Sequence, residues 1–310
     1  MNSGAMNQLQ SVLGRKLKVN ATLGELTTAR IGGKADGLVI ANTISELEQT
    51  AITCWQLDIP CRILGNASNV LVSDQGYRGV AIINRAKDIH FEQSGEFPFV
   101  TAASGTNLGG LARQAAIRGL SGLEWAAYIP GTVGGAVYGN AGAHGSDIQA
   151  CLIMAEILHQ NSGRERWNCE QLGFTYRSSV LKRTHDPVVI LSAQFKLTHS
   201  TKEEVQARME TFNNRRRNTQ PPGASMGSMF KNPSGDHAGR LIEAAGLKGT
   251  RIGGVEISPM HANFFVNQQD ASASDVFQLI RLVQKTVKEQ FDVELELEIE
   301  LLGEWNEIKN

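Results

Sequence analysis

Ser228 lies in the segment GSMFKN (residues 227–232), where a small hydroxyl is flanked by glycine and bulky apolar residues and followed by lysine and asparagine. This pattern indicates a hydroxyl held beside an anionic ligand. Ser228 has no nearby histidine in the sequence and no G-x-S-x-G turn around it, so it lacks the usual surroundings of a hydrolase nucleophile. A positioned hydroxyl can instead donate a proton to a developing carbanion. The alternative is a serine whose side chain only caps a turn.

Two further segments place charged side chains among apolar residues. Arg177 follows Tyr176, with apolar residues on both sides of this short stretch, and its guanidinium needs an anionic partner because it keeps its charge. That partner is either a ligand or the carboxylate of a structural salt bridge. Glu298 belongs to the run LELEIELLG (residues 295–303), in which glutamates alternate with apolar residues. A strand would place the glutamates at 294, 296, 298 and 300 on one face, so their spacing does not single out Glu298 among them. A solvated strand face is the alternative interpretation.

Small residues gather in two segments that could contact a nucleotide. Residues 64–69, LGNASN, follow a predicted strand, and the main-chain N–H groups of such a turn can bind an anion. An ordinary polar turn is the alternative. Residues 129–143, IPGTVGGAVYGNAGA, are small at nearly every position from 130 to 136, which permits close approach of the main chain to a flat ring or a diphosphate. A tight hairpin packed on the core is the other interpretation.

The composition excludes several classes of function. The chain has 310 residues, a formal net charge of −1 and 41% hydrophobic residues, which suffices for ordinary cores and gives no general attraction for nucleic acid. It contains no apolar run long enough to span a bilayer and no signal-peptide pattern at its start. The four cysteines lack zinc-ligand spacing and are expected to be reduced thiols of a cytoplasmic protein without a metal site. The basic cluster at 215–217 is either a phosphate contact or the solvated end of a helix.

Helices and strands mixed along the chain must position these segments. Apolar spacing and capping residues predict helices at 44–57, 108–118, 202–217, 236–245 and 273–291. Short β-like runs predict strands at 37–40, 61–65, 79–84, 99–103, 152–159, 188–198, 253–257, 262–266 and 294–302. The Pro-Pro-Gly break at 221–223 is the best domain boundary, because proline cannot continue the preceding helix. The mixture predicts α+β domains, and the absence of G-x-G-x-x-G after a first strand argues against a Rossmann fingerprint.

In this order, the segments at 64–72, 129–143, 227–233 and 295–298 resemble the UDP-N-acetylenolpyruvoylglucosamine reductase family, flavoenzymes of bacterial peptidoglycan synthesis. The resemblance extends from about residue 27 to residue 303. It implies a two-subdomain FAD-binding unit of the vanillyl-alcohol-oxidase type, followed by a C-terminal α/β substrate-binding domain. The expected ranges are 1–20 for a flexible leader, 21–84 and 85–200 for the two FAD-binding subdomains, 201–303 for the substrate-binding domain and 304–310 for a tail. Few residues separate Arg177 from Ser228, which resembles the shorter form of the family, without the tyrosine loop that covers the substrate.

The resemblance also implies a reaction and roles for individual residues. NADPH reduces a non-covalently bound FAD, through which UDP-N-acetylglucosamine enolpyruvate is reduced to UDP-N-acetylmuramate. In the implied mechanism Ser228 protonates C2 of the substrate, while Arg177 and Glu298 stabilise the enolate. The implied FAD contacts are Leu64, Gly65, Asn66, Ala67, Ser68, Asn69, Ile129, Pro130, Gly131, Thr132, Gly134, Gly135, Asn140, Ala141, Gly142 and Arg216. The implied substrate contacts are Tyr176, Lys231, Asn232 and Asn263; the family usually has glycine in place of Ala67.

Two other functions are open on the sequence alone. Another FAD oxidoreductase of the same cofactor fold, such as an oxidase of a small alcohol, would share the glycine-rich loops without needing the segments of Ser228 and Glu298. A flavin-storage or scaffold protein would need none of the three catalytic side chains. The expected partners are the two small-molecule substrates, with no nucleic acid and no membrane insertion.

Overall fold

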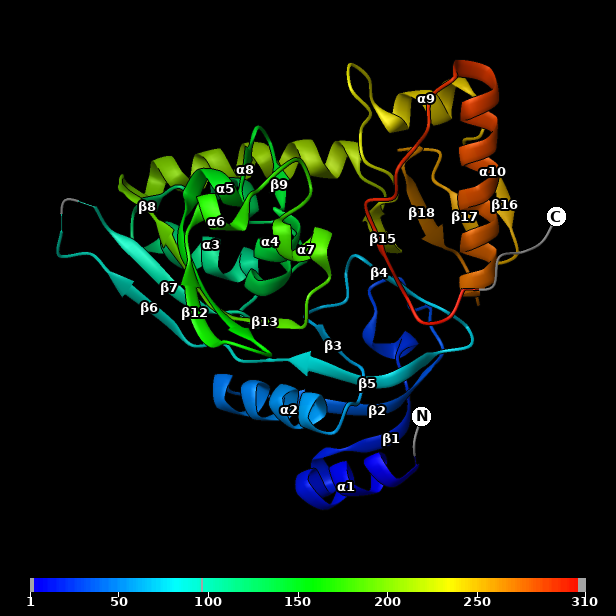
Figure 1. Ribbon diagram of the computed structural model, residues 1–310. Coiled ribbons are helices and arrows are strands. Elements are labelled where there is room, and N and C mark those ends of the chain that lie inside the picture. The colour runs from blue at the N-terminus through cyan, green and yellow to red at the C-terminus, as the bar shows by residue number, and fades with distance from the viewer. Residues whose placement is uncertain (1–2, 96, 306–310) are drawn as a thin grey trace. The chain divides into compact units, whose positions relative to one another are not determined.

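The computed structural model of the chain describes residues 3–95 and 97–305 and combines helices with several separate sheets (Figure 1). The α+β class expected from the sequence is confirmed. The chain forms two compact units and passes from one to the other several times. Unit 1 consists of Met1–Lys18, Leu38–Asn66 and Val80–Arg215, and unit 2 of Val19–Gly37, Ala67–Gly79 and Arg216–Asn310. Among the described helices, none combines the length and apolar character that a membrane crossing needs.

A five-stranded antiparallel sheet in the order β12-β11-β13-β7-β6 forms the centre of unit 1. Its strands are β6 (Ile89–Glu92), β7 (Phe99–Ala103), β11 (Leu152–His159), β12 (Gly163–Trp167) and β13 (Val188–Lys196). Strand β13 is irregular opposite β11, where its register shifts between Ser192 and Ile190. Residues two apart on a regular strand share a face, and this shift lets Phe195 and Ala193 join one hydrophobic core of the unit while Leu191 and Val189 join another.

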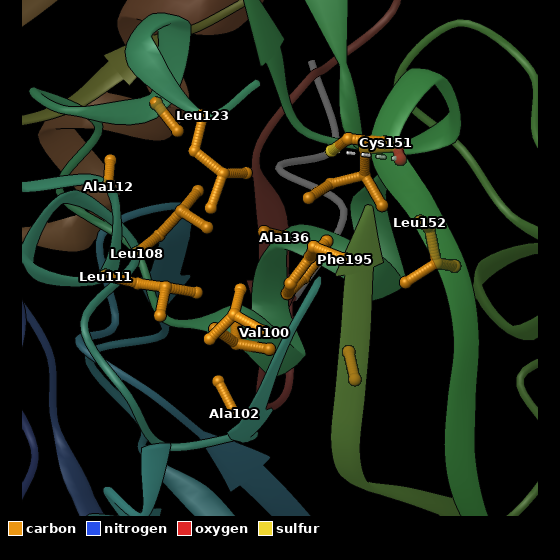
Figure 2. Close-up of a cluster of buried hydrophobic side chains, with 14 of the residues drawn as sticks. Val100, Ala102, Leu108, Leu111, Ala112, Leu123, Ala136, Cys151, Leu152 and Phe195 are labelled. Carbon is orange, nitrogen blue, oxygen red and sulfur yellow. Dashed lines mark hydrogen bonds between the residues drawn. The ribbon is translucent and has the colours of Figure 1, made fainter. Parts of the chain in front are cut away.

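The larger core of unit 1 packs helices against β7 and β13. Helix α3 (Leu108–Ile117) contributes Leu108 and Leu111, which lie beside Val100 and Phe195 in Figure 2. The short helix α4 (Val133–Gly139) contributes Val133 and Val137 to the same core. The remaining elements of this part are β8 (Leu120–Ser121), β9 (Gly142–Ala143), β10 (Ser146–Asp147), α5 (Ile148–Cys151), α6 (Cys169–Leu172), α7 (Val180–Thr184), β14 (Thr198–His199) and the 3-10 turn η3 (Glu124–Ala126). Helix α8 (Lys202–Thr219) begins in unit 1 and ends in unit 2.

The second core of unit 1 includes the first helix of the chain. Helix α1 (Ser3–Leu13) buries Leu9 completely and is followed by the turn η1 (Gly14–Lys16) and the buried Leu17. These leucines share a core with α2 (Ile44–Gln56) and β3 (Cys61–Leu64), which pairs in parallel with β5 (Tyr77–Asn84). The expectation of a flexible leader at 1–20 is therefore corrected for the described residues, because its apolar side chains complete this core.

Unit 2 is built on a four-stranded antiparallel sheet in the order β15-β18-β17-β16. The strands are β15 (Ala224–Ser228), β16 (Arg251–Ile252), β17 (Val255–Ile257) and β18 (Phe264–Asn267). Helices α9 (Ala238–Ala244) and α10 (Ala273–Phe291) share its core. A separate parallel pair joins β19 (Glu300–Leu302) to β4 (Val70–Val72). The turn η2 (Gly24–Leu26) also lies in unit 2, whereas β1 (Lys18–Thr22) and β2 (Lys34–Ala41), like β5, contain residues of both units.

The predicted elements agree closely in some places and differ in others. Helix α10 and strand β11 have the predicted bounds, and the other four helices end within two residues of theirs. The units are not the contiguous ranges expected from the sequence, since short N-terminal segments belong to unit 2 and the break at 221–223 lies inside it. The expected tail at 304–310 falls largely outside the described residues, although Trp305 packs against the core of unit 2.

Candidate functional site

A bulge in β15 sets the position of Ser228 in unit 2. Ser225 pairs with Val266 and Ser228 with Phe264, so this strand has one more residue than its partner between the two pairs. Such a bulge redirects the side chains that follow it. Gly227 has a φ of 77° in the bulge, a left-handed conformation that favours glycine. The glycine before Ser228 thus has a backbone role, which explains one part of the motif without a ligand.

The segments of Ser228 and Glu298 are neighbours in unit 2. The Glu298 N–H donates to the Met229 carbonyl (2.9 Å), and the Lys231 N–H donates to the Glu296 carbonyl (2.8 Å). Met229, the residue after Ser228, therefore holds the main chain of Glu298. The predicted strand at 294–302 is wrong in its first part, because only Glu300–Leu302 forms a strand. The preceding residues are held by these separate bonds, so the alternation of glutamates does not define one strand face.

The three predicted substrate contacts of unit 2 all have protein partners. Asn263 is buried, and its side-chain amide accepts from the Phe230 N–H (2.9 Å) and donates to the Phe230 carbonyl (2.8 Å). Asn232 Oδ1 accepts from the Ala238 N–H at the start of α9 (3.1 Å). Lys231 Nζ forms an ion pair with a carboxylate oxygen of Glu296 (3.0 Å). These bonds fix the chain that follows Ser228, and substrate contacts by the same residues stay predictions.

Arg177 lies on a tight turn of unit 1. The N–H and carbonyl groups of Thr175 and Ser178 bond reciprocally (3.0 and 3.1 Å), which leaves Tyr176 and Arg177 at the tip. Arg177 has a φ of 55°, a conformation that costs a residue other than glycine about 1 kcal/mol or more. Its guanidinium carbon lies 5.2 Å from the centre of the Tyr176 ring, and 51% of Tyr176 is exposed. Strained backbone at an arginine is typical of a functional position.

Gly142 has no Cβ, and its absence leaves room for the Arg177 side chain. A Cβ at Gly142 would lie 3.1 Å from Arg177 Nη1, closer than side chains ordinarily pack. It would also lie 2.7 Å from the Ser146 carbonyl oxygen. The predicted cofactor segment 140–142 and the predicted carboxylate-binding arginine are therefore neighbours within unit 1.

The first predicted cofactor loop begins in unit 1, directly after β3. A Cβ at Gly65 would lie 2.2 Å from Thr132 Oγ1, so the close approach of these two segments requires glycine. Asn66 Oδ1 accepts from Arg85 Nη1 (2.9 Å), and its Nδ2 donates to the Gly131 carbonyl (3.5 Å). The structure thus brings together the two glycine-rich segments that the sequence singles out.

The second half of this loop belongs to unit 2. Ala67 has a φ of 45°, in the region that favours glycine, so the usual glycine of the family matches the conformation that Ala67 adopts here. Its carbonyl accepts from the Thr28 N–H (3.4 Å). Asn69 Nδ2 donates to the Glu298 carbonyl (3.0 Å), while Ser68 is half-buried. Asn69 therefore helps to hold the main chain of a predicted catalytic residue.

The glycines around α4 differ in their surroundings. Gly134 is packed, since its N–H donates to the Ser104 carbonyl (2.8 Å) and a Cβ would lie 2.9 Å from Ser104 Cβ. A Cβ at Gly131 would meet only one atom of Ile129 at 3.9 Å, and at Gly135 only Thr132 Oγ1 at 3.6 Å. Open main chain beside a packed glycine forms a surface that a flat ring or a diphosphate can approach. These residues fit a flavin nucleotide.

Arg216 near the end of α8 is half-buried, and no ion pair joins it to a residue within 3–95 or 97–305. Burial lowers the pKa of its guanidinium. The group nevertheless stays charged at neutral pH, and a half-buried charge favours an anionic partner. This environment supports the phosphate contact over the solvated helix end as the role of the basic cluster.

Some side chains near the site were not singled out by the sequence. Ser179 is completely buried, and its Oγ donates to the Tyr138 carbonyl (2.7 Å). Its only sequence signal was its place two residues after Arg177. His144 stacks on Phe212 with ring centres 4.4 Å apart, which gives this histidine a packing role. Within the described ranges, no three histidine, cysteine or acidic side chains are grouped to hold a metal ion.

Comparisons with known proteins cover nearly the whole chain. A family model described as an FAD binding domain matches residues 35–167, and one described as the C-terminal domain of UDP-N-acetylenolpyruvoylglucosamine reductase matches residues 219–302. The UDP-N-acetylenolpyruvoylglucosamine reductase of Bacillus subtilis (strain 168) is 44% identical over 289 residues, which covers 93% of this chain and 94% of that protein. The protein of the same name from Chloroflexus aggregans is 41% identical over 289 residues, with 92% and 97% covered.

A solved structure is similar over almost its entire length. The crystal structure of UDP-N-acetylenolpyruvylglucosamine reductase from Thermus caldophilus matches with a TM-score of 0.78 and 37% identity, covering 92% of this chain and 99% of that one. The range matched by the FAD-binding model contains both glycine-rich segments. The range matched by the C-terminal model contains Ser228 and Glu298, and Arg177 lies between the two ranges.

Proposed function

Because the chain belongs to the UDP-N-acetylenolpyruvoylglucosamine reductase family, we propose that it reduces UDP-N-acetylglucosamine enolpyruvate to UDP-N-acetylmuramate with NADPH. The chain is an FAD-dependent oxidoreductase of this family. The reaction is a step of peptidoglycan precursor synthesis. Its place is the cytoplasm, where NADPH and nucleotide sugars are found.

The observation that carries the proposal is the neighbouring position of the Ser228 and Glu298 segments. Their main chains are joined through the bond from the Glu298 N–H to the Met229 carbonyl (2.9 Å). Neighbouring segments that supply a hydroxyl and a carboxyl group suit a reaction that protonates a carbanion, whereas oxidation of a small alcohol has no such step. This arrangement therefore favours the reductase over the alternative oxidoreductase.

Three side chains of the protein act on the substrate in this proposal. Bound FAD supplies the chemistry of hydride transfer from NADPH to C3 of the enol ether. Arg177 binds the substrate carboxylate and, together with Glu298, stabilises the negative charge that develops on the enolate. Ser228 Oγ then donates its proton to C2, which completes the lactyl ether.

The cofactor and substrate contacts follow from the same assignment. The FAD contacts are the residues predicted at 64–69 and 129–142 together with Arg216, and their support is the open main chain at Gly131 and Gly135. Tyr176 lies beside Arg177 at the tip of its turn, where an exposed ring can cover a bound substrate. Lys231, Asn232 and Asn263 contact the diphosphate or sugar, through the groups that their protein partners leave available.

The decisive experiment measures NADPH consumption by the purified protein with and without UDP-N-acetylglucosamine enolpyruvate. We expect rapid consumption that depends on the enolpyruvyl compound and yields one UDP-N-acetylmuramate per NADPH. A flavin absorbance spectrum without enolpyruvate-dependent turnover would instead favour a different FAD oxidoreductase. A protein without flavin absorbance, even after incubation with FAD, would favour the scaffold alternative.

The bound flavin is expected to be released when the protein is denatured with acid. Covalent attachment in proteins with this cofactor fold uses a histidine or cysteine of these loops. Here His144 is the nearby histidine, and it stacks on Phe212 with ring centres 4.4 Å apart. Precipitation with acid, followed by absorbance measurements on the supernatant and the pellet, checks this. Yellow colour that stays in the pellet would show a covalent bond.

A further inference from the structure

Asn140 has a buried side chain with three hydrogen bonds inside unit 1. It follows α4 with a φ of 44°, and only 1% of the residue is exposed. Its Nδ2 donates to the Thr175 carbonyl (3.1 Å) and to Asp147 Oδ2 (3.3 Å), and its Oδ1 accepts from the Gln149 N–H (3.1 Å). The nitrogen and the oxygen of the side-chain amide are both hydrogen-bonded to these partners. A contact between Asn140 and a cofactor would therefore have to come from its main chain.

One of these partners begins the turn that carries Arg177. Thr175 and Ser178 close this turn through their reciprocal bonds, with Arg177 between them (3.0 and 3.1 Å). On the other side of the turn, Ser179 Oγ donates to the Tyr138 carbonyl (2.7 Å). Two partly buried hydrogen bonds therefore fix the turn to the end of α4.

A strained turn needs this support. Arg177 has a left-handed φ of 55°, which an arginine adopts only where its surroundings hold it. Without the amide of Asn140, the carbonyl of Thr175 would keep the Ser178 N–H as a donor but lose the bond that ties the turn to α4. The turn could then relax toward a conformation that points the guanidinium elsewhere.

We propose that Asn140 is a positioning residue, which holds the turn of Arg177 so that the guanidinium meets the substrate carboxylate. The inference rests on the proposed function, because it assumes that Arg177 binds this carboxylate. It explains why the residue is an asparagine: this side chain both tolerates the left-handed backbone and bonds a carbonyl and an N–H at once.

The central variant is Asn140→Gly, because glycine keeps the left-handed backbone and removes only the amide. Glycine keeps the main chain through which Asn140 would contact the cofactor. We therefore expect NADPH to reduce the flavin of this variant at nearly the parent rate, while reoxidation by the enolpyruvyl substrate slows by about tenfold, as for a misplaced catalytic group. In an Arg177→Ala background, Asn140→Gly should have little further effect on reoxidation, because residues that act as one unit are not additive.

The matched control is Asn168→Gly. Asn168 is another asparagine at a helix end in unit 1, where its side chain caps α6 by accepting from the Gln171 N–H (3.0 Å). It has no bond to the Arg177 turn. This variant should lose some thermal stability and keep both half-reactions. If Asn140→Gly does not fold, Asn140→Ser keeps one hydrogen-bonding group and should show a smaller loss in the same half-reaction.

Several results would overturn the proposal. Asn140→Gly could reoxidise at the parent rate, lose both half-reactions equally, or slow reoxidation by the same factor with and without Arg177. Amide hydrogen exchange of Ser178 gives a reading that does not depend on the substrate, since loss of the Asn140 bond should speed this exchange. If the parent protein bound FAD but did not turn over the enolpyruvyl compound, the proposed function would fail, whereas unchanged Ser178 exchange would contradict the positioning role itself.

Discussion

Ser228→Ala is expected to leave flavin reduction by NADPH close to the parent rate and to slow flavin reoxidation by the enolpyruvyl substrate by roughly 10²-fold or more. In the proposed mechanism the hydroxyl is the proton donor to C2, and no protein proton is needed when NADPH reduces the flavin. The bulge before Ser228 sets the direction of its side chain, so the alanine variant should fold with the same main chain. Rapid mixing followed at the flavin absorbance band measures the two half-reactions separately.

Two further variants make this test specific. Ser228→Cys should recover part of the lost rate, because a thiol is still a proton source. Ser225→Ala is the matched control, since Ser225 lies in the same strand on the other side of the bulge and should keep both rates. If Ser228→Ala reoxidised at the parent rate, Ser228 would be a structural residue, and the acid would be Glu298 or a bound water.

Arg177→Lys is expected to slow the reaction with the enolpyruvyl substrate by tenfold or more and to spare flavin reduction by NADPH. Lysine keeps the charge but loses the planar group that can donate two parallel hydrogen bonds to a carboxylate. The loss corresponds to one charge-assisted contact, about 1.5–3 kcal/mol. Both residues carry a Cβ, so the strain of the left-handed turn is the same in the two proteins. Single-turnover kinetics over a range of substrate concentrations checks the prediction.

Arg208→Lys provides the comparison for this variant. Arg208 lies in the part of helix α8 that belongs to unit 1, and its Nε donates to Glu124 Oε1 (2.9 Å), so it also meets a carboxylate but does so within the protein. The control should lose some stability without a difference between the two half-reactions. Equal slowing of both half-reactions by Arg177→Lys would mean that Arg177 is a structural residue as well.

The sequence predicted those elements whose signals are local. Helix α10 runs from Ala273 to Phe291 as predicted, because its apolar face is regular and Ser272 caps it by accepting from the Asp275 N–H (3.0 Å). Thr43 caps α2 in the same way by accepting from the Glu46 N–H (3.1 Å). A cap and a periodic face are properties of a short segment, so no distant partner is needed to recognise them.

The features that the sequence did not predict depend on distant partners. Alternating glutamates suggested one strand over 294–302, yet the first part of this segment bonds residues near Met229 and only its end pairs with β4. The left-handed turn at Arg177 had no glycine to indicate it. The interleaved units could not be predicted either, because hydrophobic patterning does not reveal which core a short segment joins. Residue types singled out Ser228, Arg177 and the two glycine-rich segments, whereas the choice of Glu298 and the role of each residue came from the family resemblance.

The parallel pair of β4 and β19 has a consequence for how the protein is made. Val70 emerges from the ribosome long before its partner Glu300, and at about 5–20 residues per second the delay is on the order of ten seconds or more. Apolar residues of the early segments, such as Ile31 and Leu71, belong to a core whose other side chains come mostly from the end of the chain. They stay without most of their core partners during synthesis, and such exposed apolar surface makes folding intermediates prone to aggregation. The segment that carries Glu298 is among the last to be made, so the proposed catalytic site can form only after nearly the whole chain has been synthesised.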